Sequence, residues 1–308
     1  MHFVAVLNRD GGTLRTMNLD AFCAQARAIF EKHGHELDCR IVKGRMVEAA
    51  LRQAAQMRGV DAILAAGGDG TMSTAAGIAF ASGVPMGVLP AGTMNLFARA
   101  LGMPLTLSEA LEAIAGGEIG AVDIATANDR PFVHQFGVGV HARLVRIREG
   151  MSYRSRIGKM LASLRAISSA VLRPPEFAVE IRTSNGVEVR KVAGIAVSNN
   201  PLGDGHIPHA DRLDAGLLGV YVAAPMSTWA LVKLAVGVLL GTWRASPMVS
   251  EEEAAEVTLH FPNRKHGAQA VIDGELIRLD RSITLKVHPQ ALQVVLPKVE
   301  ALQSVAPA

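Results

Sequence analysis

Cysteine is scarce in this sequence, which has two, Cys23 and Cys39, among 308 residues. The two are not in CxxC spacing and belong to no wider framework of cysteines. Disulfide-stapled domains and zinc sites built on thiolates need more cysteines at closer spacing. Both classes are therefore excluded, and we interpret the two cysteines as buried thiols.

Long apolar runs and a secretory leader are also lacking. The longest apolar stretch, 229–240, contains Lys233 and falls short of the roughly 20 residues that a membrane-spanning helix needs. The apolar run at 3–7 is accompanied by neither a basic leader nor a small-residue cleavage site. We therefore expect a cytoplasmic protein without a membrane-spanning segment.

Charged residues make up 19% of the chain and hydrophobic residues 49%. Disordered proteins show the opposite balance, with few hydrophobic residues and a high net charge. A chain of this length is long for one core, and the usual size range gives about two domains. The composition therefore predicts a globular protein of two domains.

The first part of the chain alternates strand and helix signals. Apolar runs at 2–7, 37–42 and 60–65 are separated by helix-period patterns, the first of which comprises Leu19, Phe22, Ala26, Ile29 and Phe30. Such alternation is typical of a parallel sheet covered by helices on both faces. We expect an α/β domain over residues 1–121.

After about residue 123 the pattern changes to period-two runs bounded by Asn, Gly and Asp. The runs include FAVEIRT, VEVRKVAGIAV, VTLHF, ELIRL, ITLKV and LQVVL. They predict an antiparallel sandwich or barrel. We assign residues 122–298 to this all-β domain, with a C-terminal tail that could pack back on the first domain.

A basic segment, 143–173, interrupts the β pattern. It contains eight Arg or Lys residues and one acid, Glu149, which gives a charge of +7 where the whole chain carries +3. Apolar residues recur in it at helical spacing, at Ile157, Met160, Leu161, Leu164, Ile167 and Val171. One interpretation is a helix packed on its own domain with a solvated basic side, and the other is a surface that meets an anionic membrane. Nucleic-acid binding is disfavoured, because the segment lacks interleaved base-stacking aromatics.

A glycine-rich turn, GGDGT at 67–71, joins the predicted strand at 60–65 to a predicted helix at 71–81. Glycine permits close approach of a ligand to the backbone, and the N–H groups at a helix N-terminus favour an anion. Asp69 would repel a bare phosphate, so it fits better beside a magnesium ion that accompanies a nucleotide, with a helix N-cap as the alternative. A glycine-rich turn alone is a weak signal for phosphate.

A second loop strengthens the signal. In VLPAGTMNLFARALGMP, 88–104, a short strand ends near Pro90 and the loop precedes another helix. Neighbouring strands of a parallel sheet end at the same edge, where such folds bind ligands.

Together, GGDGT and PAGTMNLFARALGMP resemble the diacylglycerol kinase catalytic family, bacterial lipid kinases related to sphingosine kinases and, more distantly, to NAD kinases and phosphofructokinases. VSNNPLGDGHIPHADRLDAGLLGV (197–220) is similar to the family's asparagine–glycine loop and "DDGLLDV" segment, and VIDGELIRL (271–279) to its "DGE". The resemblance implies a Rossmann-like α/β domain of the NAD kinase and diacylglycerol kinase type, followed by an all-β sandwich domain with a helical insertion. It also implies ATP bound between the domains and attacked at the γ-phosphate by a lipid hydroxyl.

The resemblance also assigns roles to residues. It implies Glu275 as the catalytic base and Asp69 as a catalytic residue that binds Mg²⁺ with ATP. The nucleotide-binding residues that it implies are Asn8, Gly67, Gly68, Asp69, Gly70, Thr71, Gly92, Thr93 and Asn95. Without the resemblance, Glu275 is an ordinary strand residue after an Asp273–Gly274 hairpin turn of type I′.

Asp123 resembles an acid that helps to organise magnesium, with a turn acid as the alternative. The resemblance also implies Asp214 as a ligand of a structural magnesium site, where Ala215 and Gly219 replace aspartates that relatives often carry. Leu96 stands where many relatives have an acid after the asparagine.

We therefore expect an ATP- and Mg²⁺-dependent kinase of a membrane lipid (diacylglycerol, ceramide or a sphingoid base) that associates peripherally with the inner membrane face through 143–173. The alternatives are an enzyme like NAD kinase and a non-catalytic nucleotide- or lipid-binding protein on the kinase fold. The motifs do not specify an oligomeric state.

Overall fold

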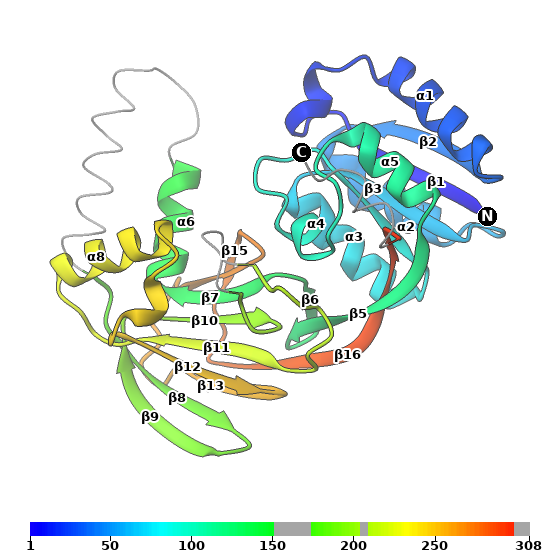
Figure 1. The fold of residues 1–308 in the computed structure, drawn as a ribbon. Coiled ribbons are helices and arrows are strands. Elements are labelled where there is room, and N and C mark those ends of the chain that lie inside the picture. The colour runs from blue at the N-terminus through cyan, green and yellow to red at the C-terminus, as the bar shows by residue number, and fades with distance from the viewer. Residues whose placement is uncertain (151–173, 204–208, 299–308) are drawn as a thin grey trace, which may run out of the picture. The chain divides into compact units, whose positions relative to one another are not determined.

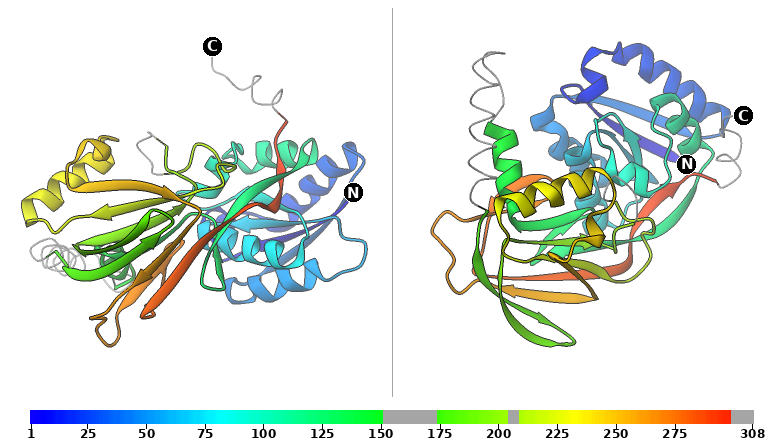
Figure 2. Two further views of the ribbon diagram at one scale, coloured as in Figure 1. Left: turned by 90° about the horizontal axis from the view of Figure 1, so that it is seen from below. Right: turned by 60° about the vertical axis from the view of Figure 1, so that its left-hand side comes forward.

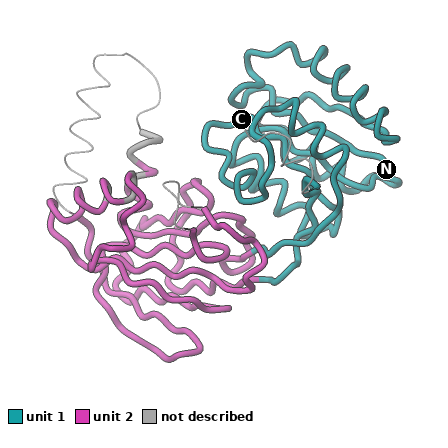
Figure 3. The backbone as a smooth tube through the Cα atoms, in the orientation of Figure 1, with its two compact units in different colours: residues 1–124, 288–308 teal, residues 125–287 magenta. Residues whose placement is uncertain are grey.

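The computed structural model describes residues 1–150, 174–203 and 209–298. The chain forms two compact units, one of residues 1–124 with the segment from His288 onward, and one of residues 125–287 (Figure 3). The division lies a few residues beyond Ala121, because the strand β5 (Glu118–Ala127) runs through that position without a break. The last strand, β16 (Ser282–Leu296), ends in the first unit, where Val294 pairs with Met86.

The first unit, unit 1, is an α/β domain (Figure 1). Along the chain its elements are β1 (His2–Asn8), η1 (Gly12–Thr16), α1 (Leu19–Lys32), β2 (Glu36–Val42), η2 (Gly44–Met46), α2 (Val47–Ala55), β3 (Ala62–Gly67), α3 (Asp69–Ser82), β4 (Met86–Pro90), α4 (Leu96–Ala100) and α5 (Leu107–Ala115). The strands lie in the order β2-β1-β3-β4-β16, and all these pairs are parallel. The predicted parallel sheet is confirmed.

Helices cover both faces of this sheet. One pair, α1 and α5, packs together and against β2 and β4, and the other pair, α2 and α3, packs together and against β1 and β3. The two pairs lie on opposite sides of the strands (Figure 2). Every residue of β3 is buried, as expected for a central strand that is covered on both faces.

The second unit, unit 2, is a β-sandwich. Its further elements are β6 (Arg130–Phe132), β7 (Gln135–Gly139), α6 (Val140–Gly150), β8 (Phe177–Thr183), β9 (Gly186–Val192), β10 (Gly194–Asn199), β11 (Leu218–Ala223), α8 (Thr228–Leu239), η3 (Trp243–Ala245), β12 (Val249–Ala254), β13 (Glu256–His260), β14 (Gln269–Ile272) and β15 (Glu275–Arg278). One sheet has the order β12-β11-β10-β7-β14-β15, and the other contains β16-β13-β8-β9. The predicted all-β fold is confirmed.

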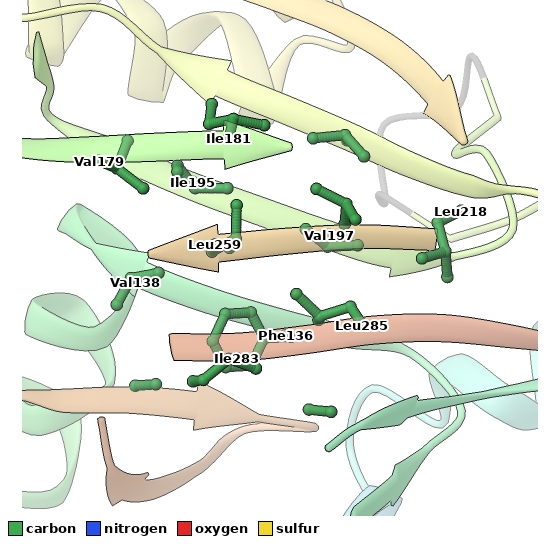
Figure 4. Packing of buried hydrophobic residues seen from close by; sticks show 14 of the residues in the cluster. Phe136, Val138, Val179, Ile181, Ile195, Val197, Leu218, Leu259, Ile283 and Leu285 are labelled. Carbon is green, nitrogen blue, oxygen red and sulfur yellow. The ribbon is translucent and has the colours of Figure 1, made fainter. Parts of the chain in front are cut away.

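The core of unit 2 lies between these two sheets. Phe136, Val138 and Ile195 extend from the first sheet, and Ile181 and Leu259 from the second (Figure 4). The period-two pattern seen in the sequence therefore places one face of each sheet in this core.

Of the basic segment 143–173, the structure describes the part within α6, and the apolar stripe predicted over 157–171 lies outside the described residues. In the described part of the chain, no helix is both long enough and apolar enough to cross a membrane.

Candidate nucleotide and phosphate site

Three loops leave the carboxyl ends of β1, β3 and β4, which are neighbours in the parallel sheet. The loop after β3 leads directly into α3, whose N-cap is Gly68. Asp69 is therefore the first helical residue, and its alternative interpretation as the N-cap is wrong. The three loops bring most of the predicted nucleotide-binding residues to one edge of the sheet.

The carboxylate of Asp69 joins two of these loops. Its Oδ2 accepts the backbone N–H of Asn95 at 3.1 Å, and its Oδ1 accepts that of Leu96 at 2.7 Å. These donors lie at the N-terminus of α4, where backbone N–H groups have no acceptor within the helix. Each carboxylate oxygen has capacity for a further partner, so Asp69 can position the second loop and also face a cation.

The second loop is shaped by Asn95, which adopts a left-handed backbone conformation with φ of 51°. Its side-chain Oδ1 accepts the N–H of Gly92 at 2.9 Å, and its Nδ2 donates to the carbonyl of Gly92 at 3.1 Å. Asn95 is 7% exposed, whereas Thr93 is exposed. The observed contacts of Asn95 therefore fix the loop, and Thr93 and Met94 are the residues that the loop exposes to solvent.

Glycine is required where the two loops meet. A Cβ added to Gly92 would lie 2.6 Å from the Cα of Gly68, closer than real Cβ atoms approach backbone. With hydrogen in place of a side chain at both positions, the backbones of the two loops come into contact. This bare backbone beside the N-terminus of α3 is a suitable surface for phosphate oxygens.

Asn8, at the end of β1, connects the loop after β1 to the start of α3. Its Nδ2 donates to Oγ1 of Thr71 at 3.3 Å, and its Oδ1 accepts the N–H of Asp10 at 3.1 Å. Thr71 is 9% exposed. The hydroxyl of Thr71 is thus held by Asn8 beneath the start of α3.

The turn after Asn8 also holds neighbouring loops in place, which the sequence did not predict. The carboxylate of Asp10 accepts the N–H of Gly44 at 2.8 Å, and Thr13 donates its N–H to the carbonyl of Ala91 at 3.0 Å. Gly12 has φ of 37°, and a Cβ on it would collide with that same carbonyl. The Asp-Gly-Gly run at 10–12 was the available signal for a tight turn here.

Asp123, the second predicted magnesium residue, lies on β5 and is completely buried. Its Oδ1 accepts the backbone N–H of Gln290 at 2.9 Å, and Gln290 has a left-handed φ of 50°. Asp123 therefore fixes β5 to a bend in β16. Because it lies within a strand, the alternative interpretation as a turn acid is wrong.

Glu275, the predicted base, is exposed at the start of β15. Its Oε2 accepts a hydrogen bond from Nη2 of Arg130 at 2.8 Å, and the two side chains are 58% and 48% exposed. One carboxylate oxygen is thus oriented by a guanidinium group that the sequence did not single out. The other oxygen is the candidate proton acceptor.

The hairpin that precedes Glu275 has the predicted type I′ turn, with φ of 46° at Asp273 and 85° at Gly274. Asp273 also has a second task. Its carboxylate accepts the backbone N–H groups of Val133 at 3.0 Å and of His134 and Gln135 at 2.9 Å each. It therefore holds the start of β7 against the turn and fixes the position from which Glu275 projects.

Asp214, the candidate ligand of a structural magnesium ion, forms an exposed ion pair with Nε of Arg212 at 3.0 Å. The hydrogen bond from Arg212 holds the pKa of Asp214 below its ordinary value. Among residues 1–150, 174–203 and 209–298, no group of three or more His, Cys, Asp or Glu side chains is placed to hold a metal ion. A magnesium ion that binds with a nucleotide needs only one or two carboxylates, because phosphates and water supply the other ligands.

In comparisons with known proteins, two family models match this chain. The model of the diacylglycerol kinase catalytic domain matches residues 2–127, and that of the YegS C-terminal NAD kinase beta sandwich-like domain matches residues 135–296. Together these two matches include the three loops of unit 1 and the hairpin that carries Glu275.

The individual relatives either have low sequence identity to this chain or match only part of it. A diacylglycerol kinase of Bacillus subtilis is 34% identical over 46% of this chain and 50% of its own length. One of Mycobacterium tuberculosis (strain H37Rv) is 26% identical over 80% of this chain and 81% of its own length. The chain spans about half the length of some curated relatives that it matches.

The fold is also shared with solved structures. A crystal structure of a diacylglycerol kinase from Bacillus anthracis superposes with a TM-score of 0.68 at 16% identity, covering 96% of this chain and 97% of the other. At this identity the likeness concerns the fold alone.

Proposed function

The chain belongs to the diacylglycerol kinase family, and on that premise we propose that it is a lipid kinase that transfers the γ-phosphate of ATP to a hydroxyl group of a membrane lipid. The acceptor class is diacylglycerol, ceramide or a sphingoid base. The observation that carries the proposal is the convergence of the loops 67–71 and 91–95 on the carboxylate of Asp69. This arrangement combines bare glycine backbone, a helix N-terminus and a carboxylate at one sheet edge.

ATP is held in this proposal by the backbone of the two glycine loops. In the first turn of α3, Thr71 already donates its N–H to the carbonyl of Gly68 at 2.9 Å. The N–H groups of Asp69 and Gly70, the first two residues of the helix, have no acceptor within it and are the ones proposed to bind phosphate oxygens. Gly68 and Gly92 keep side chains away from that surface. Thr93, exposed on the second loop, is the proposed contact to the remainder of the nucleotide.

Asp69 is the residue of this edge that we assign to Mg²⁺, because both of its oxygens are fixed by backbone N–H groups and each retains capacity for another partner. When bound, the ion neutralises negative charge on the phosphates. Asp69 also keeps α4 and the second loop in place, so the same carboxylate organises the site before any ligand arrives. Asp123 is buried, and we assign it the role of holding β5 and β16 together through its hydrogen bond with Gln290.

Glu275 is the proposed general base. The lipid hydroxyl oxygen forms a bond to the γ-phosphorus, the bond from this phosphorus to the β,γ-bridging oxygen breaks, and ADP leaves. The hydroxyl proton passes to Oε1 of Glu275, while Arg130 stays hydrogen-bonded to Oε2. A positioned general base contributes typically about 10²–10⁴-fold to the rate.

A non-catalytic nucleotide-binding protein is the second candidate. One observation favours it: the oxygens of Asp69 already accept backbone hydrogen bonds, which would be sufficient reason for an aspartate at this position. Incubation with labelled ATP and a panel of lipids and NAD in mixed micelles distinguishes the candidates, because only a kinase produces labelled acceptor.

A further inference from the structure

The outward face of α8 in unit 2 is apolar although it is exposed. Trp229 is 76% exposed, Val236 47%, and Leu240, directly after the helix, 60%. Seven residues separate the first two and four the last two, so all three lie on one side of the helix. We call Trp229, Val236 and Leu240, with the exposed Lys233 between them, the α8 stripe.

The opposite face of α8 is also apolar. Leu231 and Leu234 line an apolar cavity of about 300 Å³ with Leu202, Tyr221 and Trp243. The helix is therefore apolar on both sides. A helix that is apolar on all sides is normally buried. This indicates that a partner covers the α8 stripe in the functional state of the protein.

The segment that carries the stripe contains basic residues but no acidic ones. Residues 224–245 contain no Asp or Glu, and Lys233 lies within the stripe. The other cation of the segment, Arg244, is paired with Glu251 at 3.0 Å. The stripe therefore combines apolar side chains with one exposed cation, and its own segment has no acid to neutralise it.

We propose that the α8 stripe docks on an anionic lipid bilayer, with α8 lying in the plane of the interface. Trp is the side chain best suited to the boundary between headgroups and acyl chains. Lys233 can bury its aliphatic stem while its ammonium group stays among anionic headgroups. A helix of 12 residues is too short to span a bilayer core of about 30 Å, so α8 lies on the membrane.

A second copy of the chain fits the stripe less well. In a symmetric dimer the same surface faces itself. Two copies of Lys233 would then be brought toward each other among apolar side chains, without an acid from residues 224–245. Burial of unpaired like charges is unfavourable, whereas an anionic bilayer supplies the missing counter-charges.

This inference extends the proposed function, because a kinase of membrane lipids needs a surface that meets the membrane. It is nevertheless tested without ATP or lipid turnover. Failure of vesicle binding and failure of phosphate transfer are therefore separate results.

The test is flotation of the full-length protein with vesicles of phosphatidylcholine, with and without phosphatidylglycerol. The variant W229S/V236S/L240S should bind anionic vesicles at least about tenfold more weakly than the wild type, since it loses most of the buried apolar area. Lys233→Gln should weaken binding to anionic vesicles by about fivefold and leave binding to neutral vesicles unchanged.

The matched control is V187S/V189S. These two valines lie on β9 of the same unit and are 58% and 68% exposed, so the substitutions also remove exposed apolar side chains. Vesicle binding should be unchanged in this variant. Equal binding by the triple variant and the wild type would overturn the proposal, as would an equal loss of binding in the control.

A second measurement does not depend on the folding of the triple variant. The chain has two tryptophans, and Trp243 is 8% exposed where Trp229 is 76% exposed. Lipids brominated in the acyl chains should quench the wild-type emission, and the quenchable part should disappear in Trp229→Phe. Unquenched wild-type emission on bound vesicles would overturn the proposal. A dimer that dissociates in the triple variant, with vesicle binding retained, would assign the stripe to a second copy instead.

Discussion

Leu96 donates its backbone N–H to Oδ1 of Asp69 at 2.7 Å, and this hydrogen bond ties the loop after β4 to the loop after β3. The family resemblance led us to expect an acid at the position of Leu96, and the leucine side chain cannot contact a metal. Its backbone nevertheless takes part in the site. The aspartate of the GGDGT turn therefore has a structural partner as well as its proposed role toward Mg²⁺.

Asp69→Asn tests these two roles together. The amide oxygen can still accept one N–H, but the amide nitrogen opposes the other donor, so we expect the free energy of unfolding to fall by about 1–2 kcal/mol. Turnover should fall at least about 100-fold, because the amide does not replace a carboxylate beside Mg²⁺ and phosphate. Chemical denaturation and initial rates with labelled ATP measure the two effects.

Asp61→Asn is the matched control. Asp61 also accepts a backbone N–H, that of His2, at 2.7 Å, but it precedes β3 and so lies at the amino end of the strand. It should retain wild-type turnover. Near-normal activity of Asp69→Asn would remove Asp69 from the catalytic residues.

Gly92→Ala should separate the two loops. The new Cβ would lie 2.6 Å from the Cα of Gly68, and backbone cannot give way as a flexible side chain can. We expect ATP affinity to fall at least about tenfold, measured by isothermal titration calorimetry. Gly237→Ala, at a helical glycine where the added Cβ has ordinary contacts from 3.4 Å, should leave it unchanged. Equal affinities in the two variants would contradict the proposed phosphate surface.

Glu275→Gln should retain ATP binding and lose most of kcat, by about 10²–10⁴-fold, because the amide keeps the size of the side chain but cannot accept the proton. The control is Glu256→Gln. Glu256 is also an exposed, ion-paired glutamate of unit 2, with Lys286 at 3.9 Å. Glu256→Gln should keep full kcat. If Glu275→Gln also kept full kcat with a lipid acceptor, the hydroxyl proton would have to leave by another route.

Asp273→Asn should act mainly on stability. Asp273 accepts three backbone N–H groups, and an amide cannot accept all of them with its nitrogen in place of one oxygen. We expect a loss of about 1–3 kcal/mol in the free energy of unfolding, and a smaller loss of kcat than in Glu275→Gln. The exposed Asp280 offers the control substitution Asp280→Asn, which should be neutral. A stable Asp273→Asn protein would show that the three hydrogen bonds do not fix the turn.

The sequence was informative where structure depends on neighbours along the chain. The alternation of strands and helices, the strand-to-helix turn at 67–71 and the type I′ turn at Asp273 and Gly274 follow from local periodicity and from residues that permit positive φ. The family resemblance then led us to assign chemical roles to two of these turns, and those roles remain predictions.

The contacts of the site could not be predicted, because they join residues far apart in the sequence. The bonds from Asp69 to Asn95 and Leu96, and that between Arg130 and Glu275, depend on how loops of different elements pack. The sequence boundary at Ala121 follows a change in composition, whereas the structural division follows strand pairing, which returns the end of β16 to unit 1.

The most direct test of the central claim is transfer of the labelled γ-phosphate of ATP, with Mg²⁺, to diacylglycerol, ceramide, a sphingoid base and NAD presented in mixed micelles. The account predicts a labelled lipid, formed by the wild type and lost in Asp69→Asn and Glu275→Gln. Labelled NAD, or ATP binding without any labelled acceptor, would contradict the proposal that this protein is a lipid kinase.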